Sequence, residues 1–306
     1  MNNTRFARAL LALALALAAL PATGRQASDW PAWAAPQQRK HKTLFAPRPT
    51  GGDNIFKGEA EKWLADAVEK LCAGSLRRVK DEYVAQYVSQ LGRHLAAHSA
   101  APQAGYDFVV IDDSEVNAMS VGGGRVYVNL GMLQAVESED ELAGVLAHEI
   151  GHDAFRHAPK TVTRQLFWMK GVRKVKTPAE VEKALEALFA EYERKPLAAF
   201  GEKLLGFSRF DELEADRAAF YNAYKAGYNP RALPAVLKRM ERGAKKELGK
   251  EYGKYQLLTF LFGTHPPTSQ RALAFDWESN FVKMPKKGER HGSAAFDAMK
   301  ARVAKL

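Results

Sequence analysis

Cysteine is almost absent from this chain, which has one such residue, Cys72, among 306. A single cysteine excludes an intramolecular disulfide, so the fold must depend on its core or on a bound metal. It also excludes a bacterial lipid anchor, because no cysteine directly follows the apolar N-terminal run. Cys72 ends a helical pattern, and we interpret it as a small buried hydrophobe.

Long hydrophobic runs are equally scarce. The run at residues 9–20 has 12 residues, whereas a membrane span needs about 20. Arg5 and Arg8 precede this run and Pro21 with small residues follows it, which is the layout of a secretory signal. We predict a cleaved signal peptide over residues 1–24 and a periplasmic or secreted location. A transmembrane anchor is the alternative.

Other features are missing as well. No basic run interleaved with aromatic residues is present, so we expect no nucleic-acid partner. No repeat of about 20–50 residues is visible, and no tandem helical repeat follows residue 230. The formal net charge is +10, which favours peripheral contact with an anionic envelope surface. No pattern indicates an oligomeric state.

Hydrophobic periodicity predicts an α+β protein that is mostly helical with a small sheet. Residues 25–55 are rich in proline, glycine and polar groups, and we interpret them as a flexible tether. Ser138 and Glu141 form a capping box that begins a helix over 139–157. The other expected helices are 59–71, 80–97, one from 177, 205–225 and one after 230, and the expected strands are 106–112 and 122–130.

The stretch "LAGVLAHEIGHDAF", residues 142–155, carries the clearest chemical signal. A helix turns about 100° per residue, so His148 and His152 share a face and can bind one ion. Glu149 lies one step round, where it can reach a water as a general base. By the same geometry His157 faces away, and we interpret it as structural. His94 and His98 have the same spacing with no acid beside them, so we expect no metal there.

A catalytic zinc needs a third protein ligand, and "SRFDELEADRAAF", residues 208–220, is the best source. Glu212 and Asp216 share one helix face, whereas Glu214 points nearly opposite. One acid would bind the ion, and the other would accept an N–H from a ligating histidine. Spacing leaves open which acid does which. The alternative is a solvated acidic face.

These blocks resemble the zinc metallopeptidase family that includes HtpX, the CAAX prenyl proteases, the mitochondrial OMA-type proteases and periplasmic members such as BepA. The resemblance spans roughly residues 106–275 and also includes "NAMSVGGGRVYVNLGML", "AGYNP" and "THPPTSQR". It implies a gluzincin fold over residues 56–276, with 160–204 as a candidate insertion. Residues 277–306 would be a C-terminal extension that ends in a short helix.

The resemblance also implies the roles of single residues. One Zn²⁺ per chain would be held by His148, His152 and Glu212, with Glu149 as the base. Asp216 would contact a metal ligand without binding the ion itself. A strand before the zinc helix would pair with extended substrate. We expect residues 122–130 to be this edge strand, bordering the active-site cleft. The expected substrate-binding residues are Asn117, Ala118, Met119, Gly123 and Gly124.

The block "THPPTSQR" supplies two further candidates for catalysis, His265 and Arg271. His265 precedes two prolines that fix the local chain. It would either stabilise the oxyanion or occupy the open zinc position and hold the enzyme latent. Arg271 would steady the loop or the substrate. The alternatives are a surface histidine or a helix start set by the prolines, from Thr268 onward.

Together these patterns predict an exported zinc metalloendopeptidase acting on unfolded or misassembled envelope proteins. One alternative is a zinc-stabilised chaperone or adaptor that binds unfolded chains without cleaving them, against which the intact Glu149 argues. Another is a small-molecule zinc hydrolase, which would need a closed apolar pocket.

Overall fold

A computed structural model describes most of the chain that surrounds the histidine motif. The described residues are 53–74, 76–99, 105–194, 209–248, 271, 275, 279 and 292–306. The predicted signal peptide, most of the predicted tether and His265 lie outside them.

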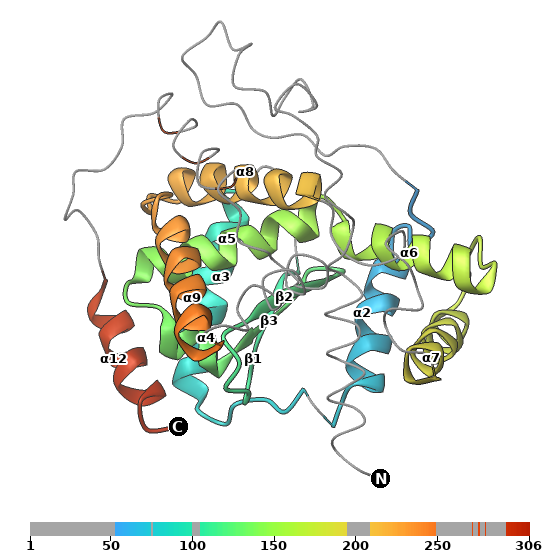
Figure 1. Cartoon of the computed structure of the whole chain (residues 1–306), viewed down its shortest axis with the longest axis horizontal. Coiled ribbons are helices and arrows are strands. Elements are labelled where there is room, and N and C mark those ends of the chain that lie inside the picture. The colour runs from blue at the N-terminus through green and yellow to red at the C-terminus, as the bar shows by residue number, and fades with distance from the viewer. Residues whose placement is uncertain are drawn as a thin grey trace, which may run out of the picture.

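The described part is mostly helical with one small sheet (Figure 1), so the α+β prediction is confirmed. The helices are α2 Ala60–Leu71, α3 Glu82–Ala97, α4 Leu130–Ala135, α5 Glu139–Ala154, α6 His157–Lys170, α7 Pro178–Arg194, α8 Arg209–Lys225, α9 Ala232–Leu248 and α12 Ala294–Val303. Within the described ranges, no helix is both long enough and apolar enough to cross a membrane.

The sheet has three strands in the order β1-β3-β2. β1 (Asp107–Ile111) is parallel to β3 (Arg125–Asn129), and β2 (Ala118–Gly122) is antiparallel to β3. The prediction that residues 122–130 form an edge strand is therefore wrong, because β3 pairs on both sides. Both β1 and β2 are edge strands, and the one beside α5 is β2, whose small residues gave no clear strand signal.

Nearly every strand residue is buried, because helices cover both faces of the sheet. Phe108, Val126 and Val128 face a core shared with α3, α5, α8, α9 and α12. Val109, Tyr127 and Val121 face a second core shared with α2, α6 and α7. The strands thus form the middle layer between two apolar cores (Figure 1).

The helix that carries the histidine motif ends earlier than the sequence predicts. Its start matches, since Ser138 caps it by accepting the Glu141 N–H at 3.2 Å. It stops at Ala154, because Arg156 adopts a left-handed backbone with φ 58° and a new helix, α6, begins at His157. The predicted helix over 139–157 is thus wrong at its C-terminal end. Pro159 in the first turn of α6 fits a helix start.

α5 and α8 lie side by side along one side of the molecule (Figure 1). Gly151 on α5 permits the close approach, because a Cβ there would lie 2.9 Å from Ala218 Cβ and 3.0 Å from the Ala215 carbonyl oxygen. The short distance between these two backbones brings the acidic residues of α8 over the histidines of α5.

The candidate insertion and the C-terminal segment both pack onto these cores. α6 and α7, which cover most of the described part of the candidate insertion, contact each other, and α7 packs on α2. At the C-terminus α12 buries Phe296, Met299 and Val303 in the core that contains α5. Both segments contribute to the apolar interior of the described structure.

Candidate metal centre

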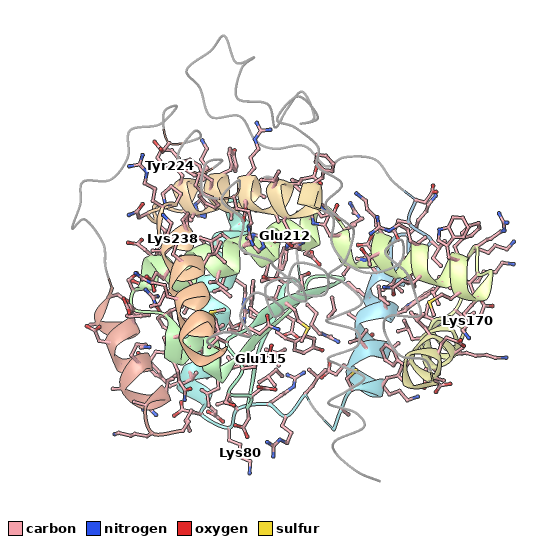
Figure 2. All side chains as sticks on the ribbon, in the orientation of Figure 1. Lys80, Glu115, Lys170, Glu212, Tyr224 and Lys238 are labelled. Carbon is pink, nitrogen blue, oxygen red and sulfur yellow. The ribbon has the colours of Figure 1, made fainter. Side chains whose placement is uncertain are left out.

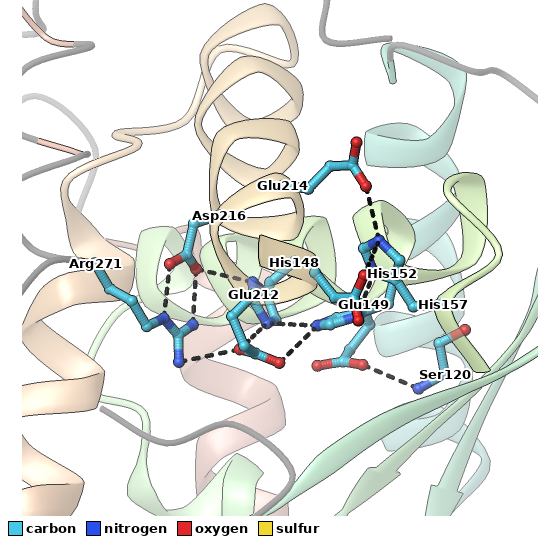
Figure 3. A network of polar contacts seen from close by, with 10 residues as sticks. Ser120, His148, Glu149, His152, His157, Glu212, Glu214, Asp216 and Arg271 are labelled. Atoms are coloured by element: carbon cyan, nitrogen blue, oxygen red, sulfur yellow. Dashed lines mark hydrogen bonds and ion pairs between the residues drawn. The ribbon is translucent and has the colours of Figure 1, made fainter. Parts of the chain in front are cut away.

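Three side chains from two helices converge between α5 and α8 (Figure 3). Nε2 of His148 and Nε2 of His152 lie 3.0 Å apart. Glu212 brings its two carboxylate oxygens to 3.5 Å from His148 Nε2 and 3.3 Å from His152 Nε2. All three residues are buried, with exposed fractions of 1–3%. Figure 2 shows Glu212 at the same position, enclosed between the two helices.

These three groups fit a zinc ion. Imidazole nitrogen and carboxylate oxygen are ligands that zinc takes. Bonds of about 2.0–2.1 Å in a tetrahedron place neighbouring ligand atoms roughly 3.3 Å apart, and the observed separations are 3.0–3.5 Å. The site offers three protein ligands, the number typical of a catalytic zinc with one open position.

Glu149 extends from α5 toward the sheet. Its Oε2 accepts a hydrogen bond of 2.9 Å from the backbone N–H of Ser120 on the edge strand β2. The side chain is 2% exposed and follows His148 directly in sequence. The candidate base is therefore held between the helix α5 and the strand β2.

A buried ion pair between Arg271 and Asp216 contacts the candidate ligands Glu212 and His148 (Figure 3). Arg271 donates from Nε and Nη2 to Asp216 at 2.6 and 2.7 Å, and its Nη1 lies 3.2 Å from Glu212. Asp216 Oδ1 lies 3.0 Å from Nδ1 of His148. Burial alone would raise the pKa of Asp216, but the charge of Arg271 and the hydrogen bonds from Arg271 and His148 together outweigh burial and lower it, so this carboxylate is ionised at neutral pH.

The two candidate ligand histidines differ in their surroundings. Burial lowers the pKa of His152 well below its usual value, although Glu212 opposes the shift. Burial also disfavours protonation of His148, yet its hydrogen bonds to Asp216 and Glu212 prevail and raise its pKa to about 9. Two carboxylates, those of Asp216 and Glu212, thus contact His148, whereas His152 contacts that of Glu212.

Sequence reasoning missed two residues at this site, His157 and Glu214. His157 Nδ1 lies 2.8 Å from His152 Nδ1, and His157 Nε2 lies 3.0 Å from Glu214 Oε2. The expectation that His157 faces away is wrong because α5 ends before it, and the turn at Arg156 redirects its ring. Pro159 was the signal that could have revealed this break.

The expected substrate-binding residues lie on and beside β2. The carbonyl of Asn117 accepts the Asn129 N–H at 3.0 Å, so it faces β3, and Ala118 begins the strand. Met119 packs against the core that contains α2. Gly123 and Gly124 form the turn to β3 with positive φ.

Asp153 holds this turn from α5. Its Oδ1 accepts the Gly124 N–H at 2.9 Å, and the Ser120 hydroxyl lies 3.5 Å from the same oxygen. The helix α5 is therefore joined to the β2–β3 hairpin at two points, through Glu149 and through Asp153.

The second histidine pair is built differently. His94 Nε2 lies 3.1 Å from the Ala226 carbonyl oxygen, and His98 Nδ1 lies 2.8 Å from the His94 carbonyl oxygen. Neither belongs to the groups of potential metal ligands found among the described residues. One ring nitrogen of each histidine is thus hydrogen-bonded to a backbone carbonyl oxygen.

Comparison with known proteins finds similarity to one peptidase family. The model of peptidase family M48 matches residues 82–277. The "Beta-barrel assembly-enhancing protease" of Escherichia coli K12 is 26% identical over 197 residues, which are 62% of this chain and 39% of that protein. The "Mitochondrial metalloendopeptidase OMA1" of Schizosaccharomyces pombe is 31% identical over 185 residues, 60% of this chain and 50% of that protein.

The chain thus spans about two fifths of the length of the bacterial relative, 39% of which is matched. The family match covers more than half of the chain and contains the whole convergence of α5 with α8. The chain therefore belongs to peptidase family M48, a family of metallopeptidases.

Proposed function

We propose that the chain is a zinc-dependent metalloendopeptidase that hydrolyses peptide bonds of unfolded or misassembled envelope proteins. The observation that carries the proposal is the convergence of His148, His152 and Glu212 with Glu149 adjacent to them. Those three residues would hold one zinc ion per chain. When bound, zinc would act as a Lewis acid on the scissile carbonyl and lower the pKa of water.

The chain's own residues have distinct parts in this reaction. Glu149 takes the proton of the attacking water and returns it to the leaving amine. The Ser120 N–H holds one oxygen of Glu149. Arg271 pairs with Asp216 and Glu212, so we assign it to positioning those carboxylates. For His265 the two roles inferred from sequence remain predictions.

An extended polypeptide would pair with β2, which is hydrogen-bonded to another strand on one side only. The Ser120 N–H points away from β3 toward Glu149, and alternation places the Ala118 backbone groups on the same side. Pairing through backbone groups gives little side-chain selectivity. Unfolded chains are therefore the substrates that this arrangement suits, and a small-molecule hydrolase is disfavoured.

One protein supplied in two states tests this substrate class. Reduced and alkylated α-lactalbumin should be cleaved, and the native, disulfide-bonded form should stay intact under the same conditions. Equal cleavage of both forms would contradict the preference for unfolded chains. Binding of the unfolded form without cleavage, in zinc-loaded protein, would favour the chaperone or adaptor alternative.

We also propose that the protein is exported and contacts anionic lipid through the outer end of α6 and the loop after it. Residues 157–179 contain no aspartate or glutamate. Trp168 is 71% exposed, and Arg173, Lys174 and Lys176 beside it are exposed. Exposed tryptophan flanked by cations suits a lipid headgroup region. Figure 2 shows Lys170, at this end of α6, far from Glu212.

Vesicle co-sedimentation tests this surface. Binding should require phosphatidylglycerol, and Lys174→Glu with Lys176→Glu should weaken it by roughly 30-fold or more, since each basic residue contributes about 1 kcal/mol. Lys80→Glu with Lys238→Glu changes the net charge equally at positions away from this end (Figure 2) and should have less effect. Equal losses in both double variants would contradict a defined lipid-binding surface.

A further inference from the structure

A chain of three buried side chains runs away from the zinc site (Figure 3). His152 Nδ1 lies 2.8 Å from His157 Nδ1, and His157 Nε2 lies 3.0 Å from Glu214 Oε2. The exposed fractions of His152, His157 and Glu214 are 1%, 1% and 3%. The proposed reaction assigns no part to His157 or Glu214, although burying such groups is costly.

Counting protons fixes the direction of these contacts when a metal is bound. A metal on His152 Nε2 requires a lone pair there, so the proton of a neutral ring is on Nδ1. That Nδ1–H then donates to Nδ1 of His157, which must itself be unprotonated. The remaining proton of His157 is on Nε2, where it donates to Glu214. Each donor therefore meets an acceptor.

We propose that His157 and Glu214 form a relay that fixes His152 in its metal-binding tautomer and ring orientation. The inference rests on the proposed zinc site and assigns both residues as positioning residues. His148 reaches a carboxylate directly, since its Nδ1 lies 3.0 Å from Asp216. His152 reaches a carboxylate through one intervening imidazole. Each ligand histidine is thus backed by an acid, as a ligating imidazole commonly is.

The rival interpretation is a second cation site. His157, Asp211 and Glu214 each offer a ligand atom, and these atoms lie within 4.8 Å of one another. A cation on Nε2 of His157 would need a lone pair there. With His152 donating to its Nδ1, neutral His157 has its proton on Nε2. The relay therefore excludes a second cation at His157 while His152 binds the first.

Variants of His157 separate a relay from mere space filling. His157→Phe keeps an aromatic ring but loses both hydrogen bonds, and we expect zinc affinity to fall about 10–100-fold, as for other outer-shell partners. In His157→Gln the amide can accept from His152 and donate to Glu214, so most of the affinity should return. Competition with a chromophoric chelator measures the zinc affinity, and the visible spectrum of the Co²⁺ form reports the ligand field.

The two acids near His157 provide a matched control. Glu214 Oε2 lies at hydrogen-bond distance from Nε2, whereas Asp211 Oδ1 lies 3.6 Å away. Glu214→Ala should weaken zinc binding at least about tenfold, Glu214→Gln less, and Asp211→Asn should match the parent chain. Circular dichroism checks the fold of each variant, and the Glu214 pair decides if His157→Phe does not fold.

Three results would overturn the relay. They are unchanged zinc affinity and Co²⁺ spectrum in folded His157→Phe and Glu214→Ala, equal losses in Asp211→Asn and Glu214→Ala, or two zinc ions per chain. A parent chain that binds no zinc would instead refute the proposed function. Failure of the relay and failure of the zinc site are therefore distinguishable.

Discussion

Glu149 accepts a 2.9 Å hydrogen bond from the backbone N–H of Ser120, and this contact joins α5 to the strand β2. The same strand is where we propose that substrate pairs. The proposed base is thus fixed relative to both the candidate metal ligands on α5 and the proposed substrate position along β2. This arrangement orients the carboxylate before substrate arrives, and such preorganisation favours catalysis.

Glu149→Gln should abolish hydrolysis while preserving the site. The glutamine carbonyl can still accept the Ser120 N–H, and no metal ligand changes, so we expect parental zinc content and melting temperature. Loss of the general base should reduce the rate by about 100-fold or more. Metal analysis and a fluorogenic peptide assay measure the two quantities. Hydrolysis within a few-fold of the parent rate would contradict the assignment.

Gly151→Ala should weaken zinc binding by separating the two helices. Alanine is favoured over glycine within a helix by about 1 kcal/mol, but the new Cβ would lie 2.9 Å from Ala218 Cβ. Relieving this overlap requires α8, which carries Glu212, to move. We expect roughly tenfold weaker zinc binding and a cost of about 1–3 kcal/mol from overpacking.

Gly74→Ala is the control for this substitution, since a Cβ there meets no atom within 4 Å. Zinc affinity should stay at the parental value in this variant. Parental zinc affinity in Gly151→Ala as well would show that the helix separation does not govern the position of Glu212.

How much of the site the sequence predicts depends on how local each contact is. Helical spacing alone places His148 and His152 on one face, and it brings Glu212 and Asp216 together on another helix. Helical spacing does not say which of these two acids binds the metal. The answer depends on how α8 crosses α5 at Gly151, which is a contact between distant segments. Only the resemblance to a family points to Glu212 as the ligand.

The errors have equally specific causes. Helical geometry predicts His157 on the far side of α5, but that prediction extends the helix past the left-handed residue Arg156, where the helix breaks. The sequence pattern does not predict the strand β2, because Ala118, Ser120 and Gly122 have little intrinsic strand preference. Its place beside β3 depends on tertiary packing, which local periodicity does not record.

Lys300 should contribute measurably to stability because it joins α12 to the end of α4. Its ammonium group donates to the carbonyls of Leu133, Gln134 and Val136, each at 2.8 Å. Lys300→Met should cost about 1–2 kcal/mol and lower the melting temperature by roughly 2–6 °C. Lys305→Met, at an exposed position in the same segment, is the control. Equal melting temperatures for both variants would refute this role.

Cys72 should resist alkylation in the folded protein. Burial raises the pKa of its thiol from 9.0 to about 12, and only the thiolate reacts. Because the folded pKa is raised, the neutral thiol stabilises the fold fully below pH 9, and this contribution is lost as pH rises toward 12. Mass spectrometry after iodoacetamide treatment at about pH 8 should detect label only in denaturant. Rapid labelling of folded protein would contradict the burial.

Zinc-dependent restoration of proteolysis tests the central claim most directly. Metal-free protein receives zinc in increments, and cleavage of an unfolded substrate is measured beside bound metal, with Glu149→Gln as the inactive control. The account predicts that activity rises in proportion to bound zinc, levels off at one ion per chain, and stays about 100-fold or more lower in the control. Full activity without metal, or equal activity in Glu149→Gln, would contradict it.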